Sequence, residues 1–392
     1  NLTFLYDGQL GGTEDSPAQG ISLASIEIDR AFLLYPARWF PVNGYSADRF
    51  TANINVTIAP NLKIITSGFS TRETVEDKVI HSYQFSQPSF PGSIAIISEE
   101  PDRLESDGIT TKIAFRNATP ELKQAYADAV GQMVRFYSEK FGAPYSSSLE
   151  LVETGEYAPV SYAAPGIVFL SPWGVGQTVN RRLLGTEVAH QWWRVLVAPG
   201  NRNHLWLDLG AALYAAALEI EAGQGEADFQ AQINDLRVEA LTYTDIPILQ
   251  SSRLPDFSTE LNVLAGAKGA MVLHMLRFML GDEAFFATIK QFVEKFAWQS
   301  ATTEDFRMVA ETVSGKNLQP FFIQWTENTG TPEFTQEYTI YRVGGGKGFR
   351  ILGKVKQDLD TFSMPVELKI ETEGEPELET VEVSGISSDY AV

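Results

Sequence analysis

The sequence predicts a multidomain α+β protein in which a mainly helical region lies between two regions of antiparallel strands. The chain has 392 residues, 44% of them hydrophobic, which suits two or three domains rather than one. Strand-like alternation ends near residue 116, helical periodicity follows, and strand-like alternation returns after residue 332. We therefore expect domains over residues 1–116, 117–332 and 333–392.

The first region has the pattern of an antiparallel β-sandwich. Residues 50–58, FTANINVTI, carry a polar side chain at every second position, as a half-buried strand does. Turn residues such as Pro60-Asn61 and Gln87-Pro88 recur between such runs, which fits a sandwich better than a parallel α/β sheet.

The helical region begins at Thr119, which can cap a helix, and Pro120, which suits a first helical turn. An amphipathic pattern continues to Lys140, and helical patterns dominate from Val179 to about Trp325. After residue 332 the pattern returns to strands, and the glycines of residues 344–348 favour a hairpin loop over a phosphate-binding loop. This last region is short for a two-sheet sandwich, which takes about 100 residues, so we expect a partial one.

Composition excludes several functions. The formal charge is −20, so we expect no nucleic-acid partner, because phosphate binding requires clustered Lys and Arg. The chain has no cysteine and no G-x-S-x-G motif, which excludes disulfides, thiolate metal sites and the commonest nucleophilic hydrolases. We find no run of about 18 apolar residues. The sequence therefore predicts a soluble segment without direct membrane insertion, from the cytoplasm or a bacterial extracytoplasmic compartment.

The most informative segments are residues 184–193, LGTEVAHQWW, and residues 203–212, NHLWLDLGAA. They resemble the signature of the M1 family of zinc aminopeptidases, in which an H-E-x-x-H helix ending in H-Q-W-W or H-Q-W-F is followed by N-D-L-W-L-N-E-G. In that family two His and a later Glu bind zinc, and the internal Glu is the general base. The resemblance implies a partial N-terminal β-sandwich, a thermolysin-like (gluzincin) helical domain and the start of a C-terminal β-sandwich.

Two of the three metal-ligand positions of this family are changed. Thr186 stands at the first His position, and Leu209, 19 residues after His190, stands at the third. His190 remains as a ligand and Glu187 remains at the general-base position. Because a catalytic zinc takes three protein ligands, the resemblance implies a degenerate H-E-x-x-H helix without metal or other cofactor.

Two further functional positions of the family also differ. Residues 267–276, AKGAMVLHML, resemble its Y-x-K-G-A helix, and the transition-state-stabilising Tyr falls on Gly266. Residues 162–166, YAAPG, stand about where the family carries G-x-M-E-N-P-G, so that its amine-binding Glu falls on Ala163.

Several polar residues near the motif have alternative interpretations. Glu187 and His190 lie three apart on one helix face and fit either a residual acid/base pair or, as we favour, a hydrogen-bonded pair lining a cleft. His204 and Asp208 flank the missing third ligand and offer a displaced metal site with His190. We disfavour that site because a residue next to Leu209 points about 100° away around a helix.

The remaining histidines and the motif tryptophans are expected to be structural. We expect His274 to pack in or beside a core, His81 to be an ordinary strand residue, and Trp192, Trp193 and Trp206 to pack the helices.

The sequence thus favours a catalytically inactive, peptidase-shaped protein, a pseudopeptidase that acts as a scaffold or binds an unidentified protein or peptide. The alternative is an active zinc aminopeptidase that uses displaced ligands, and we expect zinc only in that case.

Overall fold

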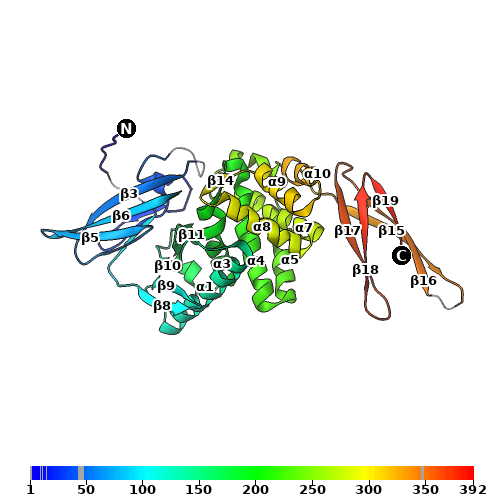
Figure 1. Cartoon of the computed structure of the whole chain (residues 1–392), viewed down its shortest axis with the longest axis horizontal. Helices are drawn as coiled ribbons and strands as arrows, with labels where there is room; N and C mark the ends of the chain where they lie inside the picture. Colours follow the sequence, from blue (N-terminus) through cyan, green and yellow to red (C-terminus); the bar gives the residue numbers. More distant parts are fainter. Residues whose placement is uncertain (1, 9, 11, 15, 43–47, 346–347) are drawn as a thin grey trace. The chain divides into compact units, whose positions relative to one another are not determined.

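The computed structural model describes all residues except 1, 9, 11, 15, 43–47 and 346–347. The chain forms two compact units, one of Asn1–Tyr243 with Ile248–Gly315 and the other of Thr244–Pro247 with Lys316–Val392. The expected multidomain α+β architecture is confirmed, with N-terminal sheets, a helical thermolysin-like domain and C-terminal strands (Figure 1). The domain bounds at residues 116 and 332 stay predictions.

The N-terminal strands of the first unit form two antiparallel sheets, ordered β1-β2-β7-β4 and β3-β6-β5. Their bounds are β1 Ala24–Ile26, β2 Ala31–Leu33, β3 Phe50–Ile58, β4 Lys63–Thr66, β5 Phe69–Val75, β6 Lys78–Ser89 and β7 Ile94–Ile97. The strand predicted at residues 50–58 is β3, in which half-buried and exposed residues alternate up to its last residue.

A third, mixed sheet has the order β11-β12-β10-β9-β8. Its strands are β8 Asp102–Ser106, β9 Ile109–Ala114, β10 Ser148–Glu153, β11 Ser161–Ala164 and β12 Ile167–Leu170. The parallel strands β9 and β10 are joined by helix α1, Pro120–Phe141, which Thr119 caps by accepting a hydrogen bond from the Leu122 amide, as predicted. The sheet therefore includes strands from both sides of the boundary predicted at residue 116.

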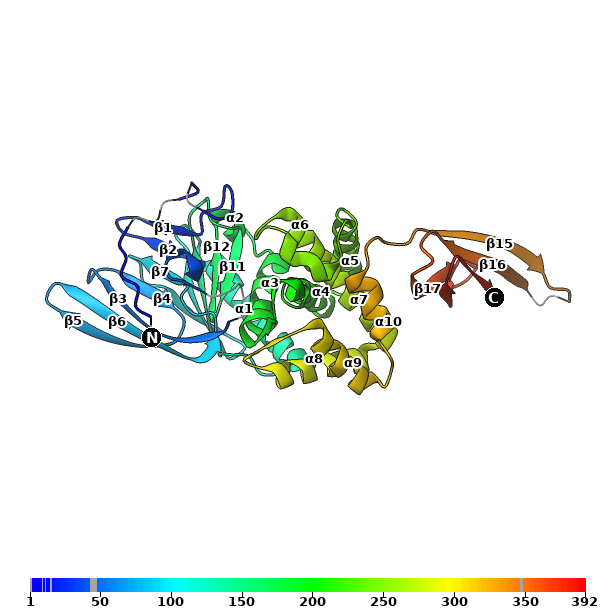
Figure 2. The same ribbon diagram turned by 90° about the horizontal axis from the view of Figure 1, so that it is seen from above.

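The core of the strand region lies between the mixed sheet and the β1-β2-β7-β4 sheet. Phe32 and Ile97 from the latter share one buried cluster with Val152 and Phe169 from the former, and Figure 2 shows the two sets of strands side by side.

Helices make up most of the rest of the first unit. They are α2 Pro172–Val175, α3 Arg181–His190, α4 Leu209–Gln224, α5 Glu226–Ala240, α6 Thr259–Leu261, α7 Lys268–Leu280, α8 Asp282–Phe296 and α9 Thr303–Ser314, with the parallel pair β13 Val197–Pro199 and β14 Gln299–Ala301. Helices α3 and α4 pack closely at Gly185, where an added Cβ would lie 3.3 Å from the Cβ of Ala216.

One stretch of the described residues, Thr259–Leu280, is long and apolar enough to cross a membrane by length and composition, contrary to the sequence expectation. Its most apolar window is 56% buried inside the protein, as in the core helix of a globular domain.

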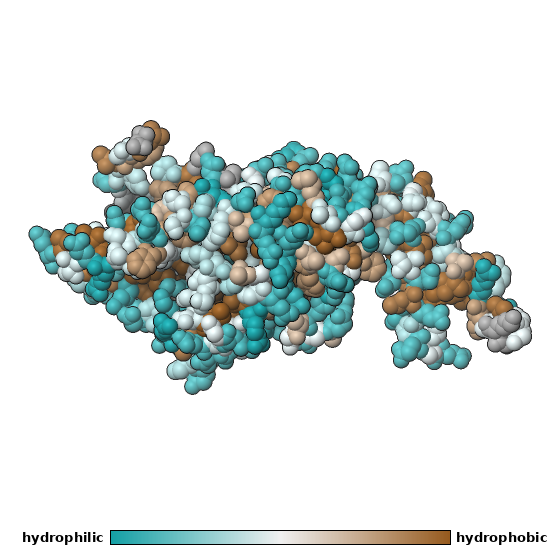
Figure 3. All heavy atoms as spheres, in the orientation of Figure 1, coloured by the Kyte–Doolittle hydropathy of each residue, from teal (hydrophilic) through white to brown (hydrophobic). Residues whose placement is uncertain are grey.

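The second unit contains a short helix, the π-helical turn Ile323–Glu327 that follows it, and two groups of strands. Helix α10, Gln319–Phe322, precedes the sheet β15-β16-β19 and the hairpin β17-β18. The strands are β15 Phe334–Arg342, β16 Phe349–Gln357, β17 Ser363–Ile370, β18 Glu377–Ser384 and β19 Ser387–Ala391. Strands β15 and β16 pair as the expected hairpin. Two residues of its loop, Gly346 and Lys347, lie outside the described residues. Large side chains with apolar surface lie exposed on these strands, among them Tyr338, Ile340 and Phe349. Figure 3 shows brown, hydrophobic atoms over this part of the surface.

Candidate functional site

Five residues singled out in the sequence line one cleft in the first unit. They are Thr186, Glu187 and His190 from α3, Leu209 from the start of α4, and Gly266 from the π-helical turn Asn262–Ala267 that precedes α7. The cleft has a volume of about 580 Å³. Helix packing thus brings these five positions together.

The walls of the cleft combine apolar and charged side chains. The apolar ones are Ile21, Pro159, Val160, Leu205, Leu209, Leu213, Phe257, Leu261 and Val263. Arg182 and Glu239 also line it and form an ion pair. Nη2 of Arg182 donates to both carboxylate oxygens of Glu239, at 2.9 and 3.0 Å.

The changed ligand positions present little that could bind a metal. The hydroxyl of Thr186 donates a hydrogen bond to the backbone carbonyl of Arg182, 2.8 Å away, on the preceding turn. Leu209 is half-buried, and a Cβ added to Gly266 would lie 3.0 Å from Cδ1 of Leu213 and 4.0 Å from Cβ of Leu209. The cleft is therefore lined by hydrocarbon beside the third-ligand position.

Glu187 keeps one carboxylate oxygen without a hydrogen-bond partner among the described residues. The side chain is buried, with 7% exposure. Its Oε1 accepts a hydrogen bond from the Ser161 hydroxyl at 2.7 Å, while Oε2 is buried and unpartnered there. Glu187 and His190 thus have separate partners, and the structure does not show the hydrogen-bonded pair that we favoured.

His190 instead contacts Asp208 and Arg194. Nδ1 of His190 lies 2.8 Å from Oδ1 of Asp208, which is within ion-pair distance. The two atoms are not aligned for a hydrogen bond. Nε2 lies 3.4 Å from Nη2 of Arg194, whose Nε donates to Oδ2 of Asp208 at 2.9 Å. Burial alone would raise the pKa of Asp208, but Arg194 and His190 outweigh it and lower that pKa below the usual value.

Asp208 and Leu209 face different cavities, as expected for neighbouring residues: Leu209 lines the cleft, and Asp208 lines a smaller cavity beside it. The approach of the Asp208 carboxylate to His190 was not expected. Asp208 is the N-cap residue of α4, with φ −100° and ψ −70°.

His204 lies at a different place from His190. Its Nδ1 accepts a hydrogen bond from the backbone amide of Thr303, at 3.2 Å, at the start of α9. Burial lowers the pKa of His204. Within the described part of the chain, no three His, Asp or Glu side chains are grouped so as to hold a metal ion. Among the described residues, the side chains grouped around His190 therefore provide fewer than the three protein ligands of a catalytic zinc.

Ala163 lines a smaller cavity rather than the cleft. It is 1% exposed and shares this cavity with Arg194 and Asp208, whereas Ser161 and Tyr162 line the cleft itself. Strand β11 is held against the end of α3 by the amide of Gln191, which donates to the Ala164 carbonyl at 3.1 Å and accepts from the Gly166 amide at 2.8 Å.

The motif tryptophans are buried, as expected: Trp192 and Trp206 are 0% exposed and Trp193 is 2% exposed. His81 is a residue of β6.

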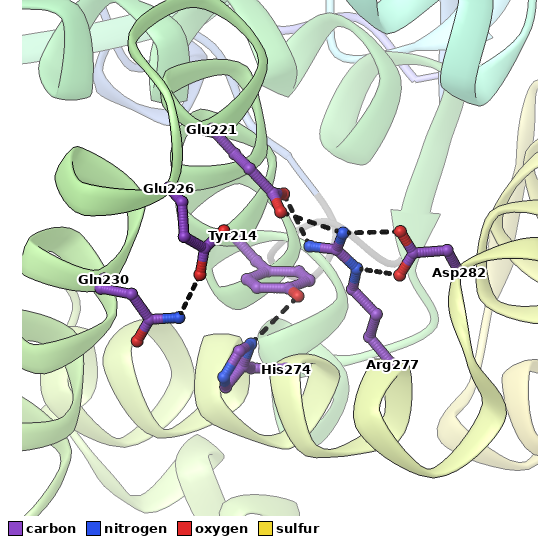
Figure 4. Close-up of polar contacts among 7 residues, drawn as sticks. All are labelled: Tyr214, Glu221, Glu226, Gln230, His274, Arg277 and Asp282. Atoms are coloured by element: carbon purple, nitrogen blue, oxygen red, sulfur yellow. Dashed lines mark hydrogen bonds and ion pairs between the residues drawn. The ribbon is translucent and has the colours of Figure 1, made fainter. Parts of the chain in front are cut away.

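His274 lies outside the residues that line the cleft and has its Nδ1 3.2 Å from the hydroxyl of Tyr214 (Figure 4). Beside it Arg277 pairs with Glu221 and Asp282, each at 2.7 Å. This cluster links α4, α7 and α8, which fits the structural role that we expected for His274.

Sequence reasoning missed Arg194 and Ser161. Arg194 follows His190 by four residues, the spacing at which helical side chains meet, so its approach to His190 was open to prediction. Ser161 is separated from Glu187 by 26 positions. The two residues meet only because the third sheet packs against α3.

Residues 176–325 match the description "Peptidase family M1 domain". Among curated proteins, the chain is 31% identical over 151 residues to Aminopeptidase M1-B of Oryza sativa subsp. japonica, which covers 37% of this chain and 17% of that protein. It is 23% identical over 315 residues to Aminopeptidase M1 of Arabidopsis thaliana, covering 75% of this chain and 36% of the relative. The chain thus spans about a third or less of the length of these two relatives.

Two solved structures share the fold. An M1 zinc metallopeptidase from Deinococcus radiodurans superimposes with a TM-score of 0.62 and 20% identity, covering 78% of this chain and 71% of that one. Legionella pneumophila aminopeptidase A, in complex with aspartic acid, superimposes with a TM-score of 0.75 and 14% identity, covering 94% of this chain and 46% of that one.

Proposed function

We propose that this chain, in which residues 176–325 form a peptidase family M1 domain, is a non-catalytic peptidase homologue that binds a peptide segment in its cleft without cleaving it. The observation that carries the proposal is the lining of this cleft by Thr186, His190 and Leu209. Of these three side chains only the imidazole is an ordinary zinc ligand. A general base such as Glu187 has no metal-activated water to deprotonate without zinc.

The lining of the cleft supports peptide binding. Its leucines offer apolar surface to a side chain, and the unpartnered Oε2 of Glu187 offers an acceptor to a main-chain N–H or an ammonium group. Ligand sites typically combine a mostly apolar lining with a few such polar groups. Burial of an acceptor without a partner costs free energy, so a donor from a ligand would stabilise this one.

The alternative is an active zinc aminopeptidase with displaced ligands, and the approach of Asp208 to His190 is the observation that favours it. Zinc binding there would require Asp208 to exchange its contact with Arg194, 2.9 Å away, for the metal. Near-stoichiometric zinc in the purified protein would favour this alternative.

A binding experiment with a readout of cleavage tests the proposal. The probe is a fluorescein-labelled leucyl peptide with a free amino terminus. Its fluorescence anisotropy should rise on binding, and mass spectrometry should show that the peptide remains intact. Gly266→Phe should fill the cleft and abolish binding, whereas Gly223→Phe, at an exposed position of α4, should not. Cleavage of the peptide, or equal binding by both variants, would contradict the proposal.

A further inference from the structure

Arg194 occupies an unusual place for an arginine, directly beside the one remaining metal-ligand residue. It belongs to the π-helical turn Gln191–Leu196 that follows α3, and its side chain is 19% exposed. Its guanidinium contacts both other members of a buried cluster, Asp208 through Nε at 2.9 Å and His190 through Nη2 at 3.4 Å.

The two ring nitrogens of His190 therefore face different partners. Nδ1 faces the carboxylate of Asp208 at 2.8 Å and Nε2 faces the guanidinium of Arg194. A neutral imidazole has one N–H and one lone pair, and a guanidinium can only donate. Because the Arg194 guanidinium can only donate, a neutral His190 presents its lone pair on Nε2 and carries its proton on Nδ1, the nitrogen nearer Asp208.

A metal ion beside His190 would use the same two groups that Arg194 contacts, the imidazole and the Asp208 carboxylate. It would take a nitrogen lone pair of the imidazole, and it would attract the carboxylate of Asp208 as a counter-charge. Arg194 already provides a fixed positive charge that contacts both groups, and an arginine keeps this charge at all physiological pH values.

We propose that Arg194 is an internal cation that takes the place of a metal ion beside His190 and closes this position to zinc. The inference deepens the proposed function and rests on it. The missing ligands weaken metal binding, and Arg194 in addition occupies the lone pair on Nε2 of His190. It follows that restoring the ligands alone will not restore tight zinc binding.

Zinc titration of ligand-restored variants tests this inference. Thr186→His with Leu209→Glu rebuilds the family's three-ligand set, and calorimetry of the full chain measures its zinc affinity. Adding Arg194→Ala should tighten zinc binding by about ten- to a hundredfold. Mutation of a group that contacts a metal ligand typically changes metal affinity by this factor, and here the change is a gain because the removed group is a cation. Adding Arg182→Ala instead removes a cation that lines the same cleft but pairs with Glu239, and should leave the zinc affinity nearly unchanged.

Equal zinc affinity with and without Arg194 in the ligand-restored background would overturn the inference and leave the proposed function intact. Zinc bound by the wild-type chain, with peptide hydrolysis, would instead contradict the proposed function.

A spectroscopic measurement keeps the inference testable if no variant takes up zinc. In ¹⁵N spectra of the metal-free wild-type chain, His190 should carry its proton on Nδ1. The variant Arg194→Ala should change the chemical shift of Nε2, and Arg182→Ala should not. A proton on Nε2 in the wild type, or no response to loss of Arg194, would overturn the inference.

Discussion

The carboxylate of Asp208 lies 2.8 Å from Nδ1 of His190, across the junction between α3 and α4. Both side chains are buried, with exposures of 2% and 4%. With Arg194 they form a polar cluster at the predicted site.

Asp208→Asn should strongly destabilise the protein, because it leaves the Arg194 guanidinium without its carboxylate. Removal of one partner of a buried ion pair costs about 3 kcal/mol or more, measurable as a lower midpoint of urea unfolding. The control is Asp256→Asn, which breaks the more exposed pair with Arg202 and should cost less than about 1 kcal/mol. Similar losses in both variants would contradict a buried cluster.

Gly210→Ala should destabilise the contact between α4 and α7. An added Cβ would lie 2.7 Å from the backbone carbon of Gly269 and 2.8 Å from the carbonyl oxygen of Ala265, and overpacking of this kind costs about 1–3 kcal/mol. Gly223→Ala, in the same helix but exposed, should instead stabilise by up to about 1 kcal/mol. A thermal melt that ranks the two variants in the opposite order would refute the close packing.

Stability should fall at mildly acidic pH because of His204. Burial lowers the pKa of this side chain in the folded state, so the unfolded chain takes up its proton first as pH falls below about 6.5. The stabilisation is fully present above that pH and is lost as pH falls through the folded-state pKa. Protonation also removes the acceptor of the Thr303 amide, 3.2 Å away, at the start of α9.

Urea midpoints at pH 7.5 and 5.5 measure this effect. His204→Asn retains an acceptor but cannot titrate, so it should lose less stability than the wild type between the two pH values. His274 and His81, whose pKa values are also lowered, remain in both proteins. Equal losses would exclude His204 as a contributor.

Arg49→Ala should weaken the attachment of the β3 strand to the helical part of the first unit. The guanidinium donates to the carbonyls of Pro88 at 2.7 Å, Gln299 at 2.9 Å and Val195. A hydrogen bond that involves a charged group contributes about 1.5–3 kcal/mol. Because Arg49 is only half-buried and water can replace part of these bonds, a total loss of about 2 kcal/mol is expected. Arg72→Ala, on the exposed strand β5, is the control and should change stability by less than about 0.5 kcal/mol.

Local sequence patterns predicted much of the fold. The alternation at residues 50–58 and the Thr119-Pro120 cap were sufficient for β3 and the start of α1, because both depend on neighbouring residues. The third sheet was not predicted, since the pairing of β9 with β10 joins strands on either side of a helix. The contact of Asp208 with His190 was not predicted for a similar reason. It depends on where α4 begins, and element boundaries are the least certain part of a sequence prediction.

The metal content and hydrolytic activity of the purified wild-type chain test the central claim most directly. Zinc measured by mass spectrometry after dialysis should be far below one ion per chain. Amino-acyl arylamide hydrolysis with added zinc should be no greater than that of Glu187→Gln. Near-stoichiometric zinc together with hydrolysis that is lost on chelation and in Glu187→Gln would contradict the account.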